Sequence, residues 1–543
     1  MANIISAIKE PLNEKILSYA SGSPEKEELK KQLKTMRENE IEIPLIIGGK
    51  EVRTGVMGEC IIPHNKNHRL AKYHIAGEKE VRMAIEAAKK AKEDWEMMPW
   101  EHRASVFLRA AELLSGSWRS TVNAATMLGQ SKTVYQAEID SACELTDFFR
   151  FNAYYLSQII QDQPMSTQDS WNRVEYRPLE GFVFAVTPFN FTAIGGNLPS
   201  APALVGNTVV WKPASTSVYS NYFVMKLLQE AGLPDGVINF VPGSGRKVGN
   251  IVMRDDSLAG IHFTGSTQVF GDIWRTVAEN LGHYKSYPRI VGETGGKNFV
   301  FAHNSCDIDA LVTGLIRGAF EYQGQKCSAA SRAYIPQSIW SKVKERLLEE
   351  TASIKVGDVE DFSNFMSAVI DNNSLENINS YFDYIKESSE AEILIGGETE
   401  SKDGFFVKPT IVLTTNPHFK TMEEEIFGPV LTIFVYPDHD LEKTVELCYA
   451  TSPYGLTGSI FARDRKVIAD LERKLYHAAS NFYINDKPTG AVVGQQPFGG
   501  SRASGTNDKA GSKLNLYRWI SPRAIKENLN PPKAYRYSFM DEK

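Results

Sequence analysis

The fold is decided by residues 181–265, which contain four short runs of β-branched and aromatic residues: GFVFAV (181–186), NTVVWK (207–212), GVINFVP (236–242) and GIHFTG (260–265). Segments with helical periodicity follow the second and fourth runs. The runs begin 26, 29 and 24 residues apart, about the length of a strand, a helix and the return to the sheet. This alternation predicts a parallel β-sheet covered by helices.

The same alternation resumes after about residue 295, with helices expected over 307–322, 338–351 and 372–388. The strands expected here are SRAYIP (331–336), AEILIGG (391–397), KPTIVLTT (408–415), PVLTIFVYP (429–437), GLTGSIFA (455–462) and SNFYIND (480–486). We therefore expect two α/β domains that join near residues 290–296.

The residues before 181 predict further elements at the edge of this core. A helix over 23–40 is expected, with Ser23 as its N-cap and Pro24 at its first position. A hairpin is expected around Gly48 and Gly49, and a mostly helical stretch from residue 78 to about 160.

Length and charge narrow the classes of function. The 543 residues allow two to four domains at about 150 residues each. With 60 basic and 66 acidic side chains and a net charge of −6, the chain has no strong field that would attract nucleic acid or an anionic membrane. The composition is compatible with a globular enzyme, and we expect no nucleic-acid partner and no membrane partner.

The cysteines and the apolar stretches bear on the compartment. Five cysteines form no CxxC pair and no regular framework, which indicates a reducing environment. The longest apolar stretch, 181–211, is interrupted by asparagines and prolines and is not expected to cross a membrane. The first residues show neither a signal peptide nor a transit peptide, so a mature cytoplasmic protein is expected. A mature chain in the mitochondrial matrix is the alternative.

Three residues at predicted element junctions carry groups that can do chemistry together. Cys327, in GQKCSA, follows a helix and precedes a strand; Glu293, in VGETGGKN, stands at the predicted domain junction. A thiol and a carboxylate in one crevice can act as nucleophile and base. Asn190, in TPFNF, follows the strand 181–186 and could donate to an oxyanion. Taken one at a time, Cys327 could instead be a core residue, and Asn190 could be a turn residue that bonds to the nearby backbone.

Seven motifs taken together resemble the aldehyde dehydrogenase superfamily. They occur in that superfamily's order over about 320 residues: TPFNF (187–191), VVWKPAS (209–215), FTGST (263–267), ETGGKN (293–298), GQKCSA (324–329), EEIFGPV (424–430) and GQQPFGGSRASGTN (494–507). Within the superfamily the chain resembles the branch that oxidises L-glutamate 5-semialdehyde, formed from 1-pyrroline-5-carboxylate, to L-glutamate in the second step of proline breakdown. Some members of that branch also carry a proline dehydrogenase barrel, and we expect the monofunctional form here.

The resemblance implies an α/β aldehyde dehydrogenase fold with a division into domains. A Rossmann-like NAD-binding domain would comprise 41–165 and 181–293, and an α/β catalytic domain would comprise 294–513. Residues 1–40 would form an N-terminal helical extension. Residues 166–180 and 514–543 would form a β flap and a C-terminal arm that join subunits, so a homodimer or a larger homo-oligomer is expected.

The resemblance also assigns roles to individual residues. Cys327 would be the nucleophile that attacks the aldehyde, Asn190 and the Cys327 backbone N–H would hold the oxyanion, and Glu293 would activate the water that hydrolyses the thioester. A thiolate suits both steps because it is a strong nucleophile and a good leaving group. The cofactor would be NAD, held at a helix N-terminus. Its predicted contacts are Lys212, Glu425, Phe427, Pro188, Trp211, Gly265 and Ser266.

The substrate of this branch carries an α-carboxylate that the protein has to bind. The loop TGAVVGQQPFGG (489–500) resembles an anchor loop, in which small residues let backbone N–H groups approach an anion. The predicted substrate contacts are the Gly490 and Ala491 amides, the Ser328 hydroxyl, and the rings of Phe191 and Phe498.

A few positions depart from the superfamily pattern. Ser215 stands where many NAD-dependent relatives have a glutamate, which makes the preference for NAD over NADP less secure. Phe270 stands where the GxTxxG motif has its second glycine, and it is expected to crowd the pyrophosphate turn. Ala491 stands where many members of this branch have serine. Glu144, in the helical stretch SACELTDFFRFNAYY, could face the aldehyde pocket, but it is left outside the catalytic set because a solvated helix face explains an acidic residue there equally well.

Three other functions stay open at this point. The chain could oxidise another aldehyde, although the anchor loop argues against this. It could keep the fold without catalysis, although the joint presence of Cys327, Glu293 and Asn190 argues against that. It could be a thiol hydrolase without a nucleotide, which would leave Lys212 and Glu425 unexplained. A metal site is not expected, because His64 and His68 lie in a loop without an acidic or cysteine partner.

Overall fold

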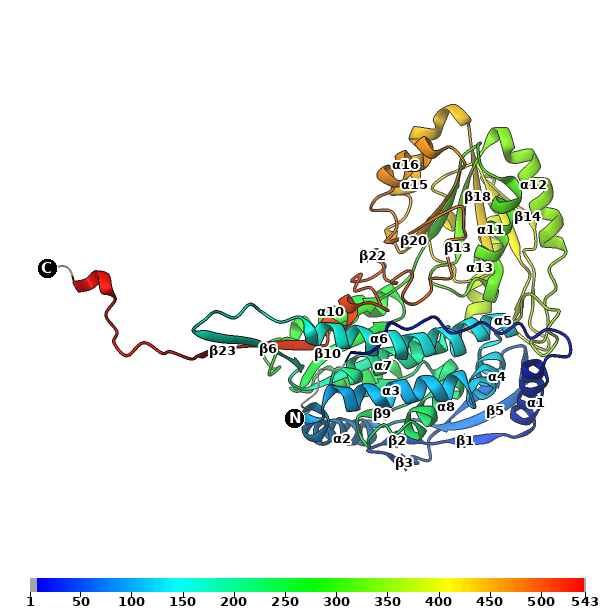
Figure 1. The fold of residues 1–543 in the computed structure, drawn as a ribbon. Helices are drawn as coiled ribbons and strands as arrows, with labels where there is room; N and C mark the ends of the chain where they lie inside the picture. The colour runs from blue at the N-terminus through cyan, green and yellow to red at the C-terminus, as the bar shows by residue number, and fades with distance from the viewer. Residues whose placement is uncertain (1–6, 542–543) are drawn as a thin grey trace.

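The structure, a computed structural model, describes residues 7–541. Figure 1 shows two lobes, each built around a seven-stranded sheet, and a narrow arm that extends from the body. Within the described residues no helix is both long enough and apolar enough to cross a membrane.

The first sheet confirms the parallel arrangement predicted from residues 181–265. Its order is β11-β10-β7-β8-β9-β2-β3, and its first five strands are parallel. The hairpin predicted around Gly48 and Gly49 pairs antiparallel at the other edge. The strands are β2 (Leu45–Ile47), β3 (Lys50–Val52), β7 (Phe182–Val186), β8 (Thr208–Lys212), β9 (Ile238–Phe240), β10 (Leu258–Thr264) and β11 (Arg289–Glu293).

The order of these strands places the functional motifs at one edge. From β7 the chain continues to β8 and β9 on one side and returns to β10 and β11 on the other. At such a switch point the loops that follow the carboxyl ends of neighbouring strands diverge and leave a crevice for a ligand. TPFNF follows β7, Lys212 ends β8, Gly265 follows β10 and Glu293 ends β11.

Helices cover both faces of this sheet, and the side chains of β7 show how. Val183 and Ala185 belong to one hydrophobic core, whereas Phe182 and Phe184 belong to another on the opposite face. The helices against the first core include α3 (Trp100–Ser115), α4 (Arg119–Gln130), α6 (Leu145–Gln161), α7 (Thr192–Leu204) and α8 (Val218–Glu230). Those against the second are α2 (Glu78–Met97), α9 (Gly245–Val252) and α10 (Thr267–Glu279).

The second sheet has the order β14-β17-β18-β13-β12-β20-β21. All six predicted strands are present, but β14 pairs antiparallel with β17, so the sheet is mixed at this edge. The strands are β12 (Asn298–Ala302), β13 (Ala330–Pro336), β14 (Ala391–Ile395), β17 (Thr410–Thr414), β18 (Val430–Tyr436), β20 (Thr457–Phe461) and β21 (Asn481–Ile484). Its helices are α11 (Ile308–Phe320), α12 (Gln337–Ala352), α13 (Asn372–Lys386), α15 (Leu441–Ala450) and α16 (Arg465–Lys474).

The arm is a two-stranded antiparallel ribbon. β6 (Ser170–Pro178) and β23 (Ile520–Asn528) pair over their whole length, and Figure 1 shows that the ribbon and the residues after it extend away from the lobes. Smaller elements complete the chain: β1 (Ile41–Ile43), β4 (Met57–Ile62), β5 (Asn65–His74), β15 (Thr399–Glu400), β16 (Phe406–Val407), β19 (Tyr454–Gly455), β22 (Ser501–Arg502), α5 (Val134–Ala137), α14 (Lys420–Glu423), α17 (Lys513–Tyr517), the π-helix Glu138–Glu144, and the 3-10 turns Ser215–Ser217, Glu321–Gly324, Asp438–Asp440 and Ser538–Asp541.

The N-terminal region differs from its prediction. The helix α1 (Pro24–Glu38) begins where expected, but the Ser23 side chain makes no capping hydrogen bond. Residues 7–20 contain neither helix nor strand. In Figure 1 this segment is the dark blue trace that runs along α6 toward α1, where the two lobes meet. The N-terminal extension is therefore helical over only part of its length.

Candidate active site

The predicted nucleophile lies in a tightly held turn. Cys327 is buried in the loop between the 3-10 turn Glu321–Gly324 and β13. The side chain of Asn298 in β12 donates to the backbone oxygens of Cys327 and Ala329 at 2.7 and 2.9 Å, and accepts from the Thr457 N–H at 3.0 Å. These bonds attach the loop to two neighbouring strands, so Cys327 has a defined position.

Glu293 meets Cys327 across the junction of the two lobes. It is the last residue of β11, and the Cys327 Sγ lies 3.5 Å from its Oε1. Burial raises the pKa of Glu293 to about 7. Burial also raises the pKa of the Cys327 thiol well above its usual range, and the carboxylates of Glu293 and Glu425 add to this effect. The thiol therefore contacts a carboxylate that titrates near neutral pH.

Asn190 is held at the same point by the loop that precedes Cys327. It is buried, and its Nδ2 donates to the Gln325 backbone oxygen at 3.1 Å. An amide nitrogen carries two N–H groups, so one remains for a ligand. The residues after it are fixed by Asp140, whose carboxylate accepts from the Thr192 and Ala193 N–H groups at 3.0 and 2.8 Å.

Glu425 contacts the segment that carries Glu293. Its Oε1 accepts from the Gly296 N–H at 2.8 Å, and burial raises the pKa of its carboxyl to about 7. A Cβ at Gly295 would lie only 2.3 Å from the Glu425 carboxylate, which explains why this position needs glycine. Phe427 packs edge-on against Phe189, with ring centroids 5.8 Å apart. The EEIFGPV motif therefore faces the TPFNF motif.

The remaining predicted cofactor residues lie at the edge of the first sheet, with one correction. Lys212 is buried at the end of β8 and forms no ion pair with any residue of 7–541; burial lowers the pKa of its ammonium to about 8. Pro188 is partly exposed after β7, and Ser266, next to Gly265, caps α10. Trp211 is different, because its ring is fully buried and donates to the Thr187 hydroxyl at 3.0 Å. The Trp211 side chain supports the strand and is not available to a ligand.

The predicted substrate residues line one cavity of about 290 Å³. Ser328 lies beside the nucleophile, and its hydroxyl is 2.7 Å from that of Thr489 at the start of the anchor loop. Gly490 has a φ of +96°, a left-handed conformation that a side chain would strain. The cavity is lined by all six residues expected at the substrate end: Cys327, Ser328, Gly490, Ala491, Phe191 and Phe498.

The same cavity has walls that the sequence did not reveal. Lys326 and Lys487 line it, as do Asn13, Glu14 and Ile16 from the N-terminal segment. Lys326 is buried and pairs with Glu321 at 3.1 Å. Its position directly before Cys327 is the one signal that could have identified it.

Glu144 lies on the inside of the protein and not on a solvated helix face. It ends the π-helix and lines both the large cavity and a smaller one of about 50 Å³ beside Glu293 and Lys509. Burial raises the pKa of its carboxyl well above the usual range, and the charge of Asp140 adds to this.

Two other sequence features have structural explanations. Phe270 stacks on Phe263, and its ring occupies the space beside Gly292, where a Cβ would lie 2.1 Å away. Phe270 is thus buried against the sheet. His64 contacts the Ser131 hydroxyl at 2.8 Å and pairs with Asp358 at 3.3 Å.

Three comparisons relate the chain to known proteins. The model of the Aldehyde dehydrogenase family matches residues 53–524. Delta-1-pyrroline-5-carboxylate dehydrogenase, mitochondrial, from Dictyostelium discoideum is 56% identical over 98% of this chain and 96% of its own length. The human protein of the same name is 49% identical over 97% of this chain and 94% of its own length.

A solved structure extends this likeness to three dimensions. The Delta-pyrroline-5-carboxylate dehydrogenase from Mycobacterium tuberculosis bound with NAD is 48% identical and superposes with a TM-score of 0.96 over 99% of this chain and all of that chain. The family model covers most of the sequence, and the relatives match nearly all of it. The chain therefore belongs to the aldehyde dehydrogenase family.

Proposed function

We propose that this chain oxidises L-glutamate 5-semialdehyde, formed from 1-pyrroline-5-carboxylate, to L-glutamate with NAD, the second step of proline breakdown. The observation that carries the proposal is the single cavity that joins the Cys327 thiol to the anchor loop. The names of the relatives point to the same substrate.

The residues at the edge of the first sheet fit NAD. The buried ammonium of Lys212, which has no carboxylate partner among residues 7–541, is suited to donate to ribose hydroxyls, and the Glu425 carboxylate is suited to accept from them. The N-terminus of α10, beside Gly265 and Ser266, offers unpaired N–H groups to a pyrophosphate. When bound, NAD supplies the acceptor for the hydride that leaves the substrate.

The chain's own groups account for the other steps. Glu293, 3.5 Å from the thiol, takes the proton of Cys327, and the thiolate then adds to the aldehyde carbon. The free N–H of Asn190 and the Cys327 backbone N–H donate to the resulting oxyanion. Loss of the hydride leaves a thioester on Cys327. Glu293 releases that proton to solvent and then removes a proton from water, which attacks the thioester, and Cys327 leaves as the thiolate.

The anchor loop accounts for the choice of substrate. The Gly490 and Ala491 amides and the Ser328 hydroxyl are donors for the α-carboxylate, and Phe191 and Phe498 enclose the aliphatic part. Lys326 and Lys487 also line the cavity, and both lie within ion-pair distance of Glu321.

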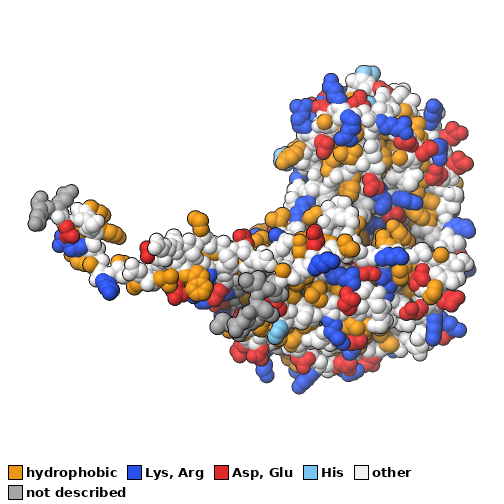
Figure 2. Space-filling model, in the orientation of Figure 1, with side chains coloured by type: hydrophobic (Ala, Val, Ile, Leu, Met, Phe, Trp, Pro, Cys, Tyr) orange, Lys and Arg blue, Asp and Glu red, His pale blue; other side chains and the backbone are white. Residues whose placement is uncertain are grey.

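The assembly and the division into domains are part of the same proposal. Apolar side chains are exposed on the arm and directly after it: Trp171 of β6 is 53% exposed, and Leu529, which follows β23, is 61% exposed. Figure 2 shows such side chains along the arm, whereas basic and acidic groups are mixed over the lobes. We infer that a second subunit covers the arm in a homodimer or larger homo-oligomer. Sedimentation of the purified protein at the mass of one chain would refute this.

We keep the domain boundaries expected above, with NAD bound by 41–165 and 181–293 and the nucleophile carried by 294–513. The cytoplasmic location stays a prediction; the names of relatives from Dictyostelium discoideum and from human favour the mitochondrial alternative. Fractionation of cells that express the chain decides between the two.

The experiment that tests the function is NADH formation from NAD and 1-pyrroline-5-carboxylate at equilibrium with its open semialdehyde. We expect activity in the wild type and none in Cys327→Ala. Wild-type protein that reduces NAD with pentanal but not with this substrate would favour the second candidate, a dehydrogenase of other aldehydes. Activity that persists in the variant would overturn the role of Cys327.

A further inference from the structure

The first part of the anchor loop, residues 489–496, has little structure of its own. It contains a single turn, in which the Gln495 and Gln496 N–H groups donate to the Val492 oxygen at 3.0 and 2.9 Å, and no helix or strand. Its position must therefore be set by contacts with the rest of the protein. One such contact is with α6, where a Cβ at Gly494 would lie 2.3 Å from the Phe151 ring.

A second contact comes from the far end of the sequence. Residues 7–22, here called the N-terminal strap, pass over the cavity, and Asn13 of the strap touches the anchor loop twice. Its Nδ2 donates to the Val493 backbone oxygen at 2.7 Å, and its Oδ1 accepts from the Gln495 Nε2 at 2.8 Å. The same Nδ2 donates to Asp147 of α6 at 2.8 Å. Asn13 thus joins the loop to the helix behind it.

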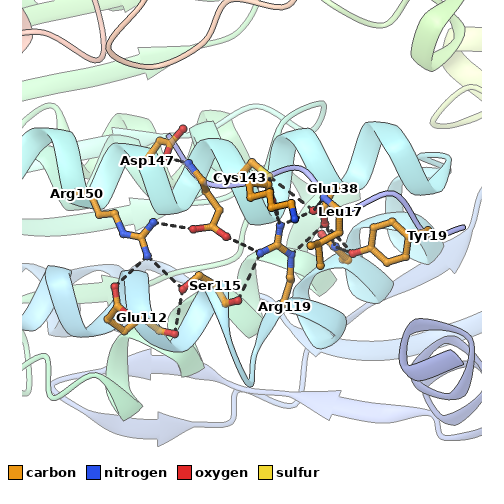
Figure 3. A network of polar contacts seen from close by, with 12 residues as sticks. Leu17, Tyr19, Glu112, Ser115, Arg119, Glu138, Cys143, Asp147 and Arg150 are labelled. Atoms are coloured by element: carbon orange, nitrogen blue, oxygen red, sulfur yellow. Dashed lines mark hydrogen bonds and ion pairs between the residues drawn. The ribbon is translucent and has the colours of Figure 1, made fainter. Parts of the chain in front are cut away.

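The strap is itself held by a network of charged groups, which Figure 3 shows. Arg119 of α4 donates to the Glu14 carboxylate at 2.8 Å and to the Lys15 backbone oxygen at 2.6 Å. Arg150 of α6 donates to the other oxygen of Glu14 at 2.7 Å. The Glu14 N–H donates to Asp147 at 2.7 Å. Three side chains from α4 and α6 therefore fix the position of Glu14, the residue next to Asn13.

The next residues of the strap are held by Glu138, which pairs with Arg119. Its carboxylate accepts from the Leu17 N–H at 2.8 Å and from the Tyr19 hydroxyl at 2.7 Å. Glu138 is fully buried, so breaking these bonds would leave a buried charge with fewer partners. The strap is thus a fixed wall of the cavity, which it lines with Asn13, Glu14 and Ile16.

We propose that Asn13 is a positioning residue for carboxylate recognition: the N-terminal strap holds the anchor loop through Asn13, so that the Gly490 and Ala491 amides face the substrate. The inference rests on the proposed function, because it assigns the strap to the carboxylate end of the cavity. Asn13 acts on binding and not on the chemical step, since the nucleophile loop is fixed separately by Asn298.

The test compares Asn13→Ala with Leu12→Ala. Leu12 is the adjacent strap residue and its side chain is 86% exposed, so the control changes the strap without touching the loop. Asn13→Ala should raise the KM for the semialdehyde about tenfold through the loss of the two bonds to the loop. It should leave kcat within about twofold. Its kcat/KM for pentanal, which has no carboxylate, should stay the same.

Amide hydrogen exchange supplies a readout that does not depend on the substrate. Exchange across residues 489–496 should accelerate in Asn13→Ala and not in Leu12→Ala. Equal losses with both aldehydes, or unchanged kinetics and exchange, would overturn the inference. If the wild type does not oxidise the semialdehyde, the proposed function fails and exchange alone decides whether Asn13 positions the loop.

Discussion

Asn298→Ala tests whether the hydrogen bonds behind Cys327 are what position the nucleophile. Asn298 is buried and makes three bonds to backbone groups, at 2.7, 2.9 and 3.0 Å. Alanine leaves those three groups without their partner, and each orphaned group costs about 1–2 kcal/mol. The free energy of unfolding should fall by about 3–6 kcal/mol. The Cys327 carbonyl loses its anchor, and a shift of about 1 Å at the nucleophile lowers kcat roughly 100-fold.

Asn239 offers a matched control on another sheet. Its side chain is also buried, donates to the Val209 and Gly236 oxygens at 3.3 and 2.8 Å, and accepts from the Gly48 N–H at 2.9 Å. Asn239→Ala should lower the free energy of unfolding by a similar amount, as measured by urea unfolding followed by circular dichroism. It should leave the rate of NADH formation in the first turnover unchanged. If Asn298→Ala is destabilised like the control and still forms NADH at the wild-type rate, the reasoning is wrong.

Two further predictions concern buried charges. Burial raises the pKa of Glu293 to about 7, so the fraction of ionised base, and with it the rate of thioester hydrolysis, should fall as the pH is lowered through 7. Glu293→Gln should remove this pH dependence. It should also move the pH profile of Cys327 alkylation to lower pH, because the variant lacks a carboxylate that raises the pKa of the thiol. An unshifted alkylation profile would contradict the contact between Glu293 and the thiol. Lys132→Met should lower the free energy of unfolding by about 3–5 kcal/mol, since it leaves the buried Asp140 carboxylate without its cation at 2.7 Å. Adding Asp140→Asn should restore part of that loss in urea unfolding, and a double variant no more stable than the single one would refute the explanation.

Much of the fold was predictable because its periodicity is local. The strands at 182, 208, 238 and 258 begin within two residues of the positions expected from the apolar runs. The antiparallel direction of β14 was not predictable, since an apolar run such as AEILIGG is compatible with parallel and with antiparallel pairing. Ser23 likewise has the right residue type for a cap but makes no bond from its side chain.

The candidate site also has residues that the sequence predicted correctly and residues that it did not. Cys327, Glu293 and Asn190 were expected together from their motifs, and the structure places them around one point. Trp211 was expected near the cofactor from the position it shares with the superfamily, but side chains alternate along a strand, so its ring enters the core. For Glu144 the sequence left both a pocket-facing and a solvated position open, and the structure places it in the lining of two cavities.

The sequence by itself determined the order of the strands and helices, the reactive groups and the loop that could bind a carboxylate. These follow from residue types at short spacing, where the backbone geometry of each element leaves few choices. Only the tertiary structure decided that Asn13 reaches Val493, 480 residues away in the chain, and that Arg119 and Glu138 hold the strap over the cavity. Such contacts depend on how whole elements pack, and no periodicity of the sequence records which distant segment satisfies a buried polar group.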